Sequence, residues 1–424
     1  MFGDKATVYL GKLFVKMGET TSLSSKVYMD VARTHVVMIA GKRGSGKSYS
    51  ASVIAEEISL MPAEVKQNMS VLFFDTMGVF WTMKYPNTRQ EKLLSEWGLL
   101  PQKIDVRILT PEGFHHEYIR QGIPSDAAFT LRVSELTADD WCQVFEESPT
   151  SAFGIAIGRA IDTLKEELGL YSIRNIVEVI QKDAKISSET KIAAESRLLV
   201  ADKWGLFSQE GTTIEDIMTP GGVTVLDISA YTSQAGDWNV KALVIGLISR
   251  KLLEERIKAR KKEEMEEIRE ERSFFAEEKS NEKPMVWVII DEAHEFLPRE
   301  GTTPATDSLV QLLREGRQPG ISLVLVTQQP GEIHKDVLTQ SDIILSHRLT
   351  AQTDVEALNS MMQSYLVADL QTYLNNLPKE QGAAIILDDN SERIYPVGIH
   401  PKRSWHGGEA PSALKVKKEL LPEI

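Results

Sequence analysis

The stretch GKRGSGKS, residues 41–48, restricts the fold of this chain more than any other feature of its sequence. An apolar run, residues 36–40, precedes it, and a segment with helical patterning, residues 49–60, follows it. Its spacing is G-x-x-x-x-G-K-S, in which glycines let the backbone turn with its N–H groups pointing inward. The helix that follows directs its positive dipole end at the same point. The pattern therefore predicts a strand, a phosphate-binding loop and a helix, in that order.

Each residue type in this loop has a chemical task. Lys47 supplies a positive charge for the outer phosphates of a nucleotide, and the hydroxyl of Ser48 can ligate Mg²⁺. The ligands that the sequence predicts are therefore ATP and Mg²⁺. The candidate nucleotide-binding residues here are Gly41, Lys42, Arg43, Gly44, Ser45, Gly46, Lys47, Ser48 and Tyr49.

Strand and helix patterns alternate on both sides of a helix-rich stretch. From residue 36 to about 110 the order is strand, loop, helix, strand (SVLFFDT), helix and strand (DVRIL), and the alternation resumes with GVTVLDIS. Such alternation implies parallel strands joined by crossover helices. The predicted fold class is α/β, with a RecA-like P-loop NTPase core, a mostly parallel sheet and a helical insertion.

We divide the chain into five segments. They are a short N-terminal segment with one possible strand (1–35), the first part of the core (36–110), the helical insertion (111–221), the second part of the core (222–400) and a C-terminal tail (401–424). Within the second part, residues 250–284 alternate charges of both signs, which favours a long solvated helix or helical hairpin. A nucleic-acid-binding arm is the alternative. We expect the charge-dense residues 256–283 to be dispensable for nucleotide hydrolysis.

A second buried-strand pattern, MVWVIIDEAHEF, places two carboxylates at its end. In open α/β sheets, ligands bind at the carboxyl ends of the strands. Asp291 is therefore a candidate to orient Mg²⁺ and its waters, and Glu292 is a candidate to polarise the attacking water. The alternative is a strand that ends in a solvated acidic turn.

Residues 306–330 read as a helix followed by a buried strand that ends in Gln328. Gln328 is a candidate to sense the γ-phosphate, and a plain polar exit from the strand is the alternative. Arg314 and Arg317 lie three apart on one helical face, so both could point at a neighbouring subunit and act on its nucleotide. Surface arginines that pair with nearby glutamates are the alternative.

The composition of the chain limits the compartment and the partners that we expect for this protein. No apolar run approaches the roughly 18 residues of a membrane span, the amino terminus lacks a secretory pattern, and there is one cysteine, Cys142. We therefore expect a cytoplasmic protein without a disulfide or a membrane partner. The net charge of −13 argues against a surface coated with nucleic-acid-binding lysines, but it is compatible with a local basic channel inside a ring.

Taken together, these stretches resemble the HerA–FtsK superfamily of ring-forming, DNA-pumping ATPases, and within it the archaeal HerA-like group. The resemblance rests on HVVMIAGKRGSGKSYS, VLFFDTMGVFW, VWVIIDEAHEFLP, LLREGRQPGISLVLVTQQP and SDIILSHRLTAQTDVEAL. It implies an ATPase that translocates or unwinds double-stranded DNA as a homohexamer. The ending RSWHGG is similar to the family's tail, which implies that Arg403 and His406 lie near a nucleotide site.

Two departures limit what the resemblance implies. HerA proteins carry a β-barrel before the ATPase core that docks the nuclease NurA, and residues 1–35 are too few for that whole barrel. The barrel is therefore reduced or absent, which puts the nuclease partnership in doubt. Many relatives have Asp-Pro-His-Gly-Glu after the second strand, where residues 75–79 here read DTMGV, so the role of that glutamate is not carried over.

Two other functions compete with a DNA motor. The letters DEAH at residues 291–294 suggest an RNA helicase of that class, but the second RecA-like domain and the arginine-rich motif of that class are missing. The second competing function is an oligomeric ATP-dependent switch or assembly platform that does not pump DNA. The excess of acidic residues slightly favours this function.

Overall fold

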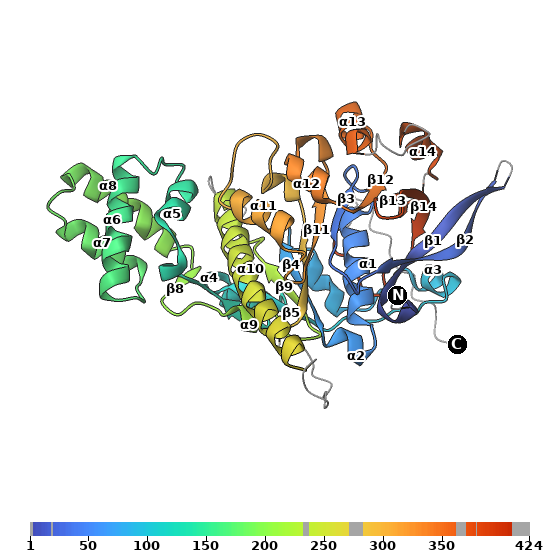
Figure 1. Cartoon of the computed structure of the whole chain (residues 1–424), viewed down its shortest axis with the longest axis horizontal. Helices are drawn as coiled ribbons and strands as arrows, with labels where there is room; N and C mark the ends of the chain where they lie inside the picture. The colour runs from blue at the N-terminus through green and yellow to red at the C-terminus, as the bar shows by residue number, and fades with distance from the viewer. Residues whose placement is uncertain are drawn as a thin grey trace.

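The computed structural model shows one large sheet with helices on both faces (Figure 1). The structure describes residues 3–17, 20–231, 237–270, 283–361, 370–378 and 380–408. Within these residues the sheet has twelve strands. In spatial order they are β2 (Thr20–Asp30), β1 (Thr7–Met17), β14 (Arg393–Ile399), β13 (Ala383–Asp388), β12 (Ile343–His347), β3 (Val36–Ala40), β11 (Ile321–Thr327), β10 (Met285–Ile290), β4 (Met69–Asp75), β9 (Val223–Asp227), β5 (Val106–Pro111) and β6 (Ala127–Phe129).

The strands from β12 to β6 all pair in parallel, and those from β13 to β2 are antiparallel. A second, two-stranded sheet joins β7 (Leu131–Arg132) to β8 (Phe207–Ser208). The predicted α/β fold class with a mostly parallel sheet is confirmed.

The central strands are apolar throughout because both faces of the sheet are covered. In β10, Val286, Val288 and Ile290 pack into the core on one face, while Trp287 and Ile289 pack into the core on the other. This alternation follows from the two-residue period of a strand. An uninterrupted apolar run is typical of parallel strands covered by helices on both sides.

The helices divide between the two faces, with α1 packed on one and α10, α11 and α12 on the other. Their bounds are α1 (Lys47–Ser59), α2 (Ala63–Lys66), α3 (Glu91–Glu96), α4 (Glu112–Arg120), α5 (Ala138–Val144), α6 (Ala152–Glu167), α7 (Ile173–Lys182), α8 (Ser188–Asp202), α9 (Ile214–Ile217), α10 (Asp237–Glu270), α11 (Thr306–Glu315), α12 (Lys335–Gln340), α13 (Gln352–Met361) and α14 (Leu370–Asn376). Short 3₁₀ turns are η1 (Gly3–Ala6), η2 (Phe80–Lys84), η3 (Val133–Glu135), η4 (Ala293–Glu295) and η5 (Pro330–Glu332).

The helical insertion stands to one side of the sheet as the bundle α5–α8 (Figure 1). Thr137, Ser151, Ser172 and Ser187 begin its four helices, and each side chain accepts a hydrogen bond from a backbone N–H of the first turn. The chain leaves the main sheet later than residue 111, where we placed the start of the insertion, because β6 still pairs with β5.

The N-terminal segment is a β-hairpin that extends the sheet. We expected one strand near Val8 to Val15, and the structure has both β1 and β2, with β1 paired to β14. The second strand has the polar sequence TTSLSSK, which carries little strand signal. β1 and β2 thus form an edge of the main sheet.

The charged segment is a continuation of α10, and its start is not solvated as we expected. Arg256 is 1% exposed, and its Nε donates a hydrogen bond of 2.7 Å to the carbonyl of Pro319. Farther along the helix, Arg260 pairs with Glu264 and Glu267 at the surface, as the alternating charges predict. Residues 271–282 of this segment lie outside the described residues.

The pairing of β1 with β14 provides a stability test. A Cβ on Gly11 would overlap the carbonyl oxygen of Gly398 in the adjacent strand. We expect Gly11→Ala to lower the free energy of unfolding by about 1–3 kcal/mol, since backbone must shift to make room. Gly158 lies inside α6, and a Cβ there would lie 3.8 Å from the Cβ of Ala138, an ordinary contact. Gly158→Ala should therefore leave stability unchanged or raise it. Denaturant unfolding of both variants measures this, and equal stabilities would contradict the strand pairing.

Candidate nucleotide-binding and hydrolysis site

The loop between β3 and α1 has the shape that its glycines predict. Gly44 and Gly46 have φ angles of 73° and 107°, in the left-handed region that favours glycine. Lys47 is 6% exposed, and its Nζ donates to the carbonyl of Lys42 at 3.1 Å, which curls its side chain back over the loop. Burial lowers the pKa of Lys47, and the nearby carboxylates of Glu292 and Asp291 oppose that shift.

Ser48 and Asp291 meet at the carboxyl edge of the sheet. The hydroxyl of Ser48 donates to Oδ2 of Asp291 at 2.9 Å. Burial, with the adjacent charge of Glu292, raises the pKa of Asp291 to about 6. A hydroxyl and a carboxylate are oxygen ligands that suit Mg²⁺, and Oε2 of Glu292 lies buried nearby without a hydrogen-bond partner. The residues present therefore fit a Mg²⁺ ion, which Ser48 and Asp291 would hold and which would neutralise phosphate charge.

Glu292 and Gln328 are also brought together, because β11 lies between β3 and β10 in the sheet. The side-chain amide of Gln328 donates to Oε1 of Glu292. Glu292 has φ 51° and ψ 44°, a left-handed conformation that costs a residue with a side chain about 1–2 kcal/mol. Such strain clusters at functional sites. Burial raises the pKa of Glu292, and the hydrogen bond from Gln328 opposes the shift.

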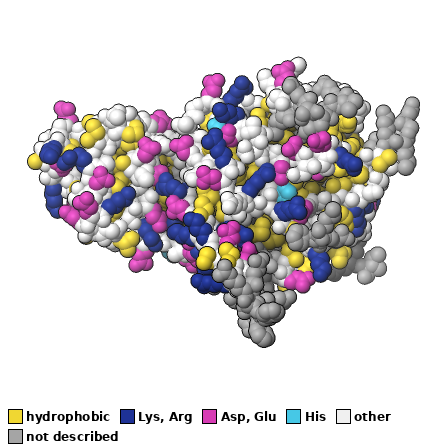
Figure 2. All heavy atoms as spheres, in the orientation of Figure 1, with side chains coloured by type: hydrophobic (Ala, Val, Ile, Leu, Met, Phe, Trp, Pro, Cys, Tyr) yellow, Lys and Arg dark blue, Asp and Glu magenta, His cyan; other side chains and the backbone are white. Residues whose placement is uncertain are grey.

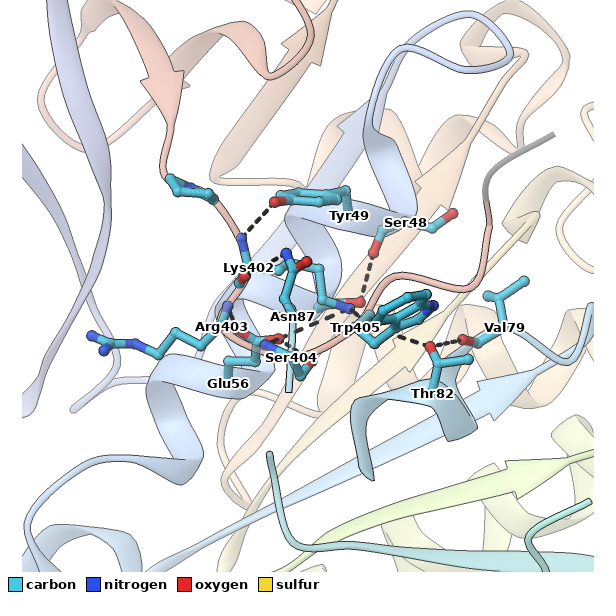
Figure 3. A network of polar contacts seen from close by, with 12 residues as sticks. Ser48, Tyr49, Glu56, Val79, Thr82, Asn87, Lys402, Arg403, Ser404 and Trp405 are labelled. Atoms are coloured by element: carbon cyan, nitrogen blue, oxygen red, sulfur yellow. Dashed lines mark hydrogen bonds and ion pairs between the residues drawn. The ribbon is translucent and has the colours of Figure 1, made fainter. Parts of the chain in front are cut away.

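The tail folds back along α1 of the same chain (Figure 3). The hydroxyl of Tyr49 accepts a hydrogen bond of 2.5 Å from the backbone N–H of Lys402. The ring of His406 meets the Tyr49 ring edge-on, with 5.1 Å between centroids. Arg403 points its Nε at Glu57, 3.4 Å from Oε1. His406 thus lies beside the residue that follows Ser48, whereas Arg403 lies further along the helix.

A buried carboxylate, Glu56, anchors this tail (Figure 3). Glu56 is fully buried in α1, where its oxygens accept hydrogen bonds from the N–H groups of Arg403 (2.9 Å) and Ser404 (3.2 Å) and from the Ser404 hydroxyl. The ammonium of Lys402, 3.9 Å away, is the nearest opposite charge. Burial raises the pKa of Glu56 and lowers that of Lys402 to about 8. Sequence reasoning missed this cluster, although a glutamate among the apolar positions of α1 was a usable signal.

Two further residues were not predicted. The ring of His347 at the end of β12 donates from Nδ1 to the carbonyl of Ala383 (3.1 Å) and accepts at Nε2 from the hydroxyl of Ser50 (2.9 Å), so it ties α1 to β13. Burial lowers the pKa of His347 to about 4, which keeps the ring neutral.

Asp75 at the end of β4 accepts from the N–H groups of residues 77–80 and shapes the loop there. Its place after a buried strand is the same signal that identified Asp291.

Arg314 and Arg317 lie away from this site. Arg314 pairs with Asp336 at 2.6 Å, and Arg317 pairs with Asp342 at 3.2 Å and donates to the carbonyl of Gln340 at 2.9 Å. Asp342 also binds the N–H of Val36 at the start of β3, whereas the phosphate loop follows the end of that strand. Five residues at about 3.3 Å each separate the two ends by roughly 16 Å.

A glycine loop ahead of a helix, facing an acidic pair at the carboxyl edge of a mostly parallel sheet, defines a P-loop ATPase. The family profile "Helicase HerA, central domain" matches residues 8–252, and "Helicase HerA-like C-terminal" matches residues 270–385. The chain belongs to the helicase HerA family.

Individual curated relatives carry the name of this family. The DNA double-strand break repair helicase HerA of Pyrococcus furiosus is 29% identical over 178 residues, which cover 40% of this chain and 31% of that protein. The protein of the same name from Sulfurisphaera tokodaii is 20% identical over 99% of this chain and 74% of its own length. The match thus spans about a third of the Pyrococcus protein.

Two solved structures share the fold. VirB4 of Thermoanaerobacter pseudethanolicus has a TM-score of 0.57 at 13% identity, covering 94% of this chain and 98% of that one. The conjugative coupling protein TrwB has a TM-score of 0.51 at 14% identity, covering 91% and 88%. Among the helices that the structure describes, none is both long and apolar enough to cross a membrane.

The Glu56 cluster gives a prediction that trypsin can test. Glu56→Ala should lower the free energy of unfolding by about 3–5 kcal/mol, because Lys402 would remain buried without its counter-charge. The released tail should become open to cleavage after Lys402 and Arg403. Glu64→Ala, which removes an exposed carboxylate from α2, should leave both stability and cleavage unchanged. Equal resistance of all three proteins to trypsin would contradict the anchoring role.

Proposed function

We propose that this chain is an ATP-driven motor that translocates or unwinds double-stranded DNA as a ring of identical subunits, most simply a homohexamer. The observation that carries the proposal is that the groups proposed for hydrolysis lie at opposite edges of the sheet in one subunit. Lys47, Glu292 and Gln328 gather at one edge of the sheet, and Arg317 lies at the other, where Asp342 also binds the start of β3. A site built in this way depends on a neighbour.

Within one subunit, the proposed chemistry is as follows. The loop N–H groups and Lys47 bind the phosphates, and Glu292 polarises the water that attacks the γ-phosphorus. Gln328 touches Glu292 directly, so it can report the presence of the γ-phosphate to the base. Burial raises the pKa of Glu292, which is the direction that makes a carboxylate a better proton acceptor.

The arginine that neutralises charge on the transferred phosphoryl group would come from the next subunit. A separation of roughly 16 Å along β3 keeps Arg317 from its own phosphates. Its guanidinium is half-exposed, with 43% of the side chain open to solvent, so a neighbour can meet it. We propose Arg317 for this role, with Arg314, at 57%, as the alternative.

DNA binding would rest on few basic residues. On the face drawn in Figure 2, Lys and Arg side chains are interspersed with Asp and Glu. Of three basic residues that could contact DNA, Lys84 is bound by Asp126 at 2.5 Å, Arg89 stacks on Trp405 at 4.3 Å, and Lys335 is exposed. Affinity would therefore come from exposed positions such as Lys335 that many subunits bring together in a pore, so binding should require the assembled ring.

An oligomeric switch that hydrolyses ATP without moving DNA is the second candidate, and the net charge of −13 favours it. Duplex DNA separates the two. For a motor, long duplex DNA should stimulate ATP hydrolysis, and its affinity should fall steeply with salt because phosphate contacts release counterions. A turnover that DNA leaves unchanged, in protein that forms rings, would favour the switch.

Two variants test the site itself. Lys47→Ala should weaken ATP binding and abolish hydrolysis, because the phosphates lose their charge partner. Glu292→Gln should bind ATP normally and hydrolyse it at least about 100-fold more slowly, since the base is lost. Glu300→Gln, an exposed carboxylate in the same loop, is the matched control and should keep full turnover. Normal turnover by Glu292→Gln would place the base elsewhere.

Mixed rings test the arginine in trans. Arg317→Ala subunits and Glu292→Gln subunits should each be inactive alone. Mixed rings contain interfaces where an intact Glu292 faces an intact Arg317, so part of the activity should return. If mixed rings form and none regains hydrolysis, and Arg314→Ala behaves in the same way as Arg317→Ala, the trans role is wrong.

A further inference from the structure

A buried arginine on the covering helix α10 contacts the turn that carries Arg317. We propose that Arg256 is a positioning residue that holds this turn, and so sets the place of the arginine that one subunit supplies to the next. The inference rests on the proposed function, and it concerns a residue that never approaches a nucleotide.

The Arg256 guanidinium bonds through Nε and Nη1 to groups from three parts of the chain. Its Nε donates to the carbonyl of Pro319 at 2.7 Å, and its Nη1 donates to the carbonyl of Lys283 at 2.6 Å. Nη1 also lies 3.2 Å from Oε1 of Glu263, which supplies the counter-charge from the same helix. The residue is 1% exposed, so these bonds are made out of reach of solvent.

The turn itself is short and closed. Between α11 and β11, the N–H of Gly320 bonds to the carbonyl of Arg317 at 3.2 Å, and the N–H of Ile321 bonds to the carbonyl of Gly316 at 2.8 Å. A Cβ on Gly320 would lie 3.0 Å from Nη2 of Arg256, so the turn packs directly on the guanidinium. The Pro319 carbonyl is therefore fixed two residues from Arg317.

Only a few other contacts hold Arg317. Its carbonyl accepts from the hydroxyl of Thr34 at 3.0 Å, and its side chain rests on Asp342 and on the carbonyl of Gln340. To reach a neighbour, the side chain must leave Asp342 while the backbone stays in place. Arg256 holds the backbone and does not touch the side chain, which is what such a motion requires.

Lysine cannot reproduce this arrangement. A guanidinium presents a planar fork of donors, which here reaches two carbonyls and a carboxylate at once, whereas an ammonium is a single point of charge on a flexible stem. Arg256→Lys keeps the charge and loses part of the fork. Since a misplacement of about 1 Å can cost about 100-fold in rate, we expect a loss of at least about tenfold in the function of Arg317.

Arg256 also bonds the carbonyl of Lys283, two residues before β10, and Glu292 follows the other end of that strand. A change at Arg256 could therefore also act on the hydrolytic site of its own subunit. Mixed rings separate the two effects. In the parent mixture, Glu292→Gln subunits supply Arg317 and Arg317→Ala subunits supply the hydrolytic site. Adding Arg256→Lys to the Glu292→Gln subunit should reduce the recovered hydrolysis at least about tenfold. Adding it to the Arg317→Ala subunit should leave the recovered hydrolysis within about twofold.

The matched control is Arg250→Lys in the Glu292→Gln subunit. Arg250 lies on the same helix, and both of its Nη atoms bond Asp140, at 3.2 and 3.0 Å. Asp140 belongs to α5 of the helical insertion and not to the turn that carries Arg317. Mixed rings made with this double variant should recover as much hydrolysis as mixed rings made with the Glu292→Gln subunit alone. Thermal unfolding and size measurements of each subunit establish that folded rings are compared, and Arg256→Gln replaces the lysine variant if that fails to fold.

The outcomes are distinct. Full recovery with the Arg256→Lys donor, or a loss that appears only when the change is in the Arg317→Ala subunit, would overturn the inference, because Arg256 would then act on stability or on its own site. Failure of the parent mixture overturns the trans role of Arg317, and the inference with it.

Discussion

Strands buried on both faces cannot carry charge along their length, so this sheet places its ionisable groups where strands end. The order β3, β11, β10 across the sheet then decides which groups meet. The phosphate loop follows β3, Gln328 follows β11, and the acidic pair follows β10. Adjacent parallel strands end at the same edge, and the site is a consequence of that alignment. The same geometry sends the turn before β11 to the opposite edge, which is why Arg317 is remote.

Charge that does enter the interior is matched by specific partners. Glu56 has backbone N–H groups, a hydroxyl and an ammonium around it, and Arg256 has two carbonyls and a carboxylate. Burying such groups is unfavourable unless each hydrogen-bonding position is filled. Both clusters join segments that are distant in sequence, so each holds one arrangement of the chain in place.

The parts of the fold and of the candidate site that depend on a local sequence pattern could be predicted from the sequence. The phosphate loop, β10 with Asp291 and Glu292, and the strand before Gln328 are each contained in a dozen residues of regular pattern. The hairpin strand β2 was missed because its side chains are largely polar and its pairing depends on β1 and the distant β14. Glu56 and Arg256 were not assigned roles because their partners are backbone groups far along the chain, which no local pattern reveals. The structure brings Ser48, Asp291, Glu292 and Gln328 together, but the chemical roles assigned to all the site residues stay predictions. The same holds for Arg314, Arg317, Arg403 and His406.

The anchoring of the tail on α1 also bears on the order in which the molecule can form. The helix that begins with Lys47 is synthesised early, but the groups that surround Glu56 belong to residues 402–404, almost 350 residues later. Until those residues have left the ribosome, the carboxylate of Glu56 has no buried partners and α1 keeps one open side. A nascent chain can therefore bury Glu56 in this way only once residues 402–404 have been synthesised and have reached α1.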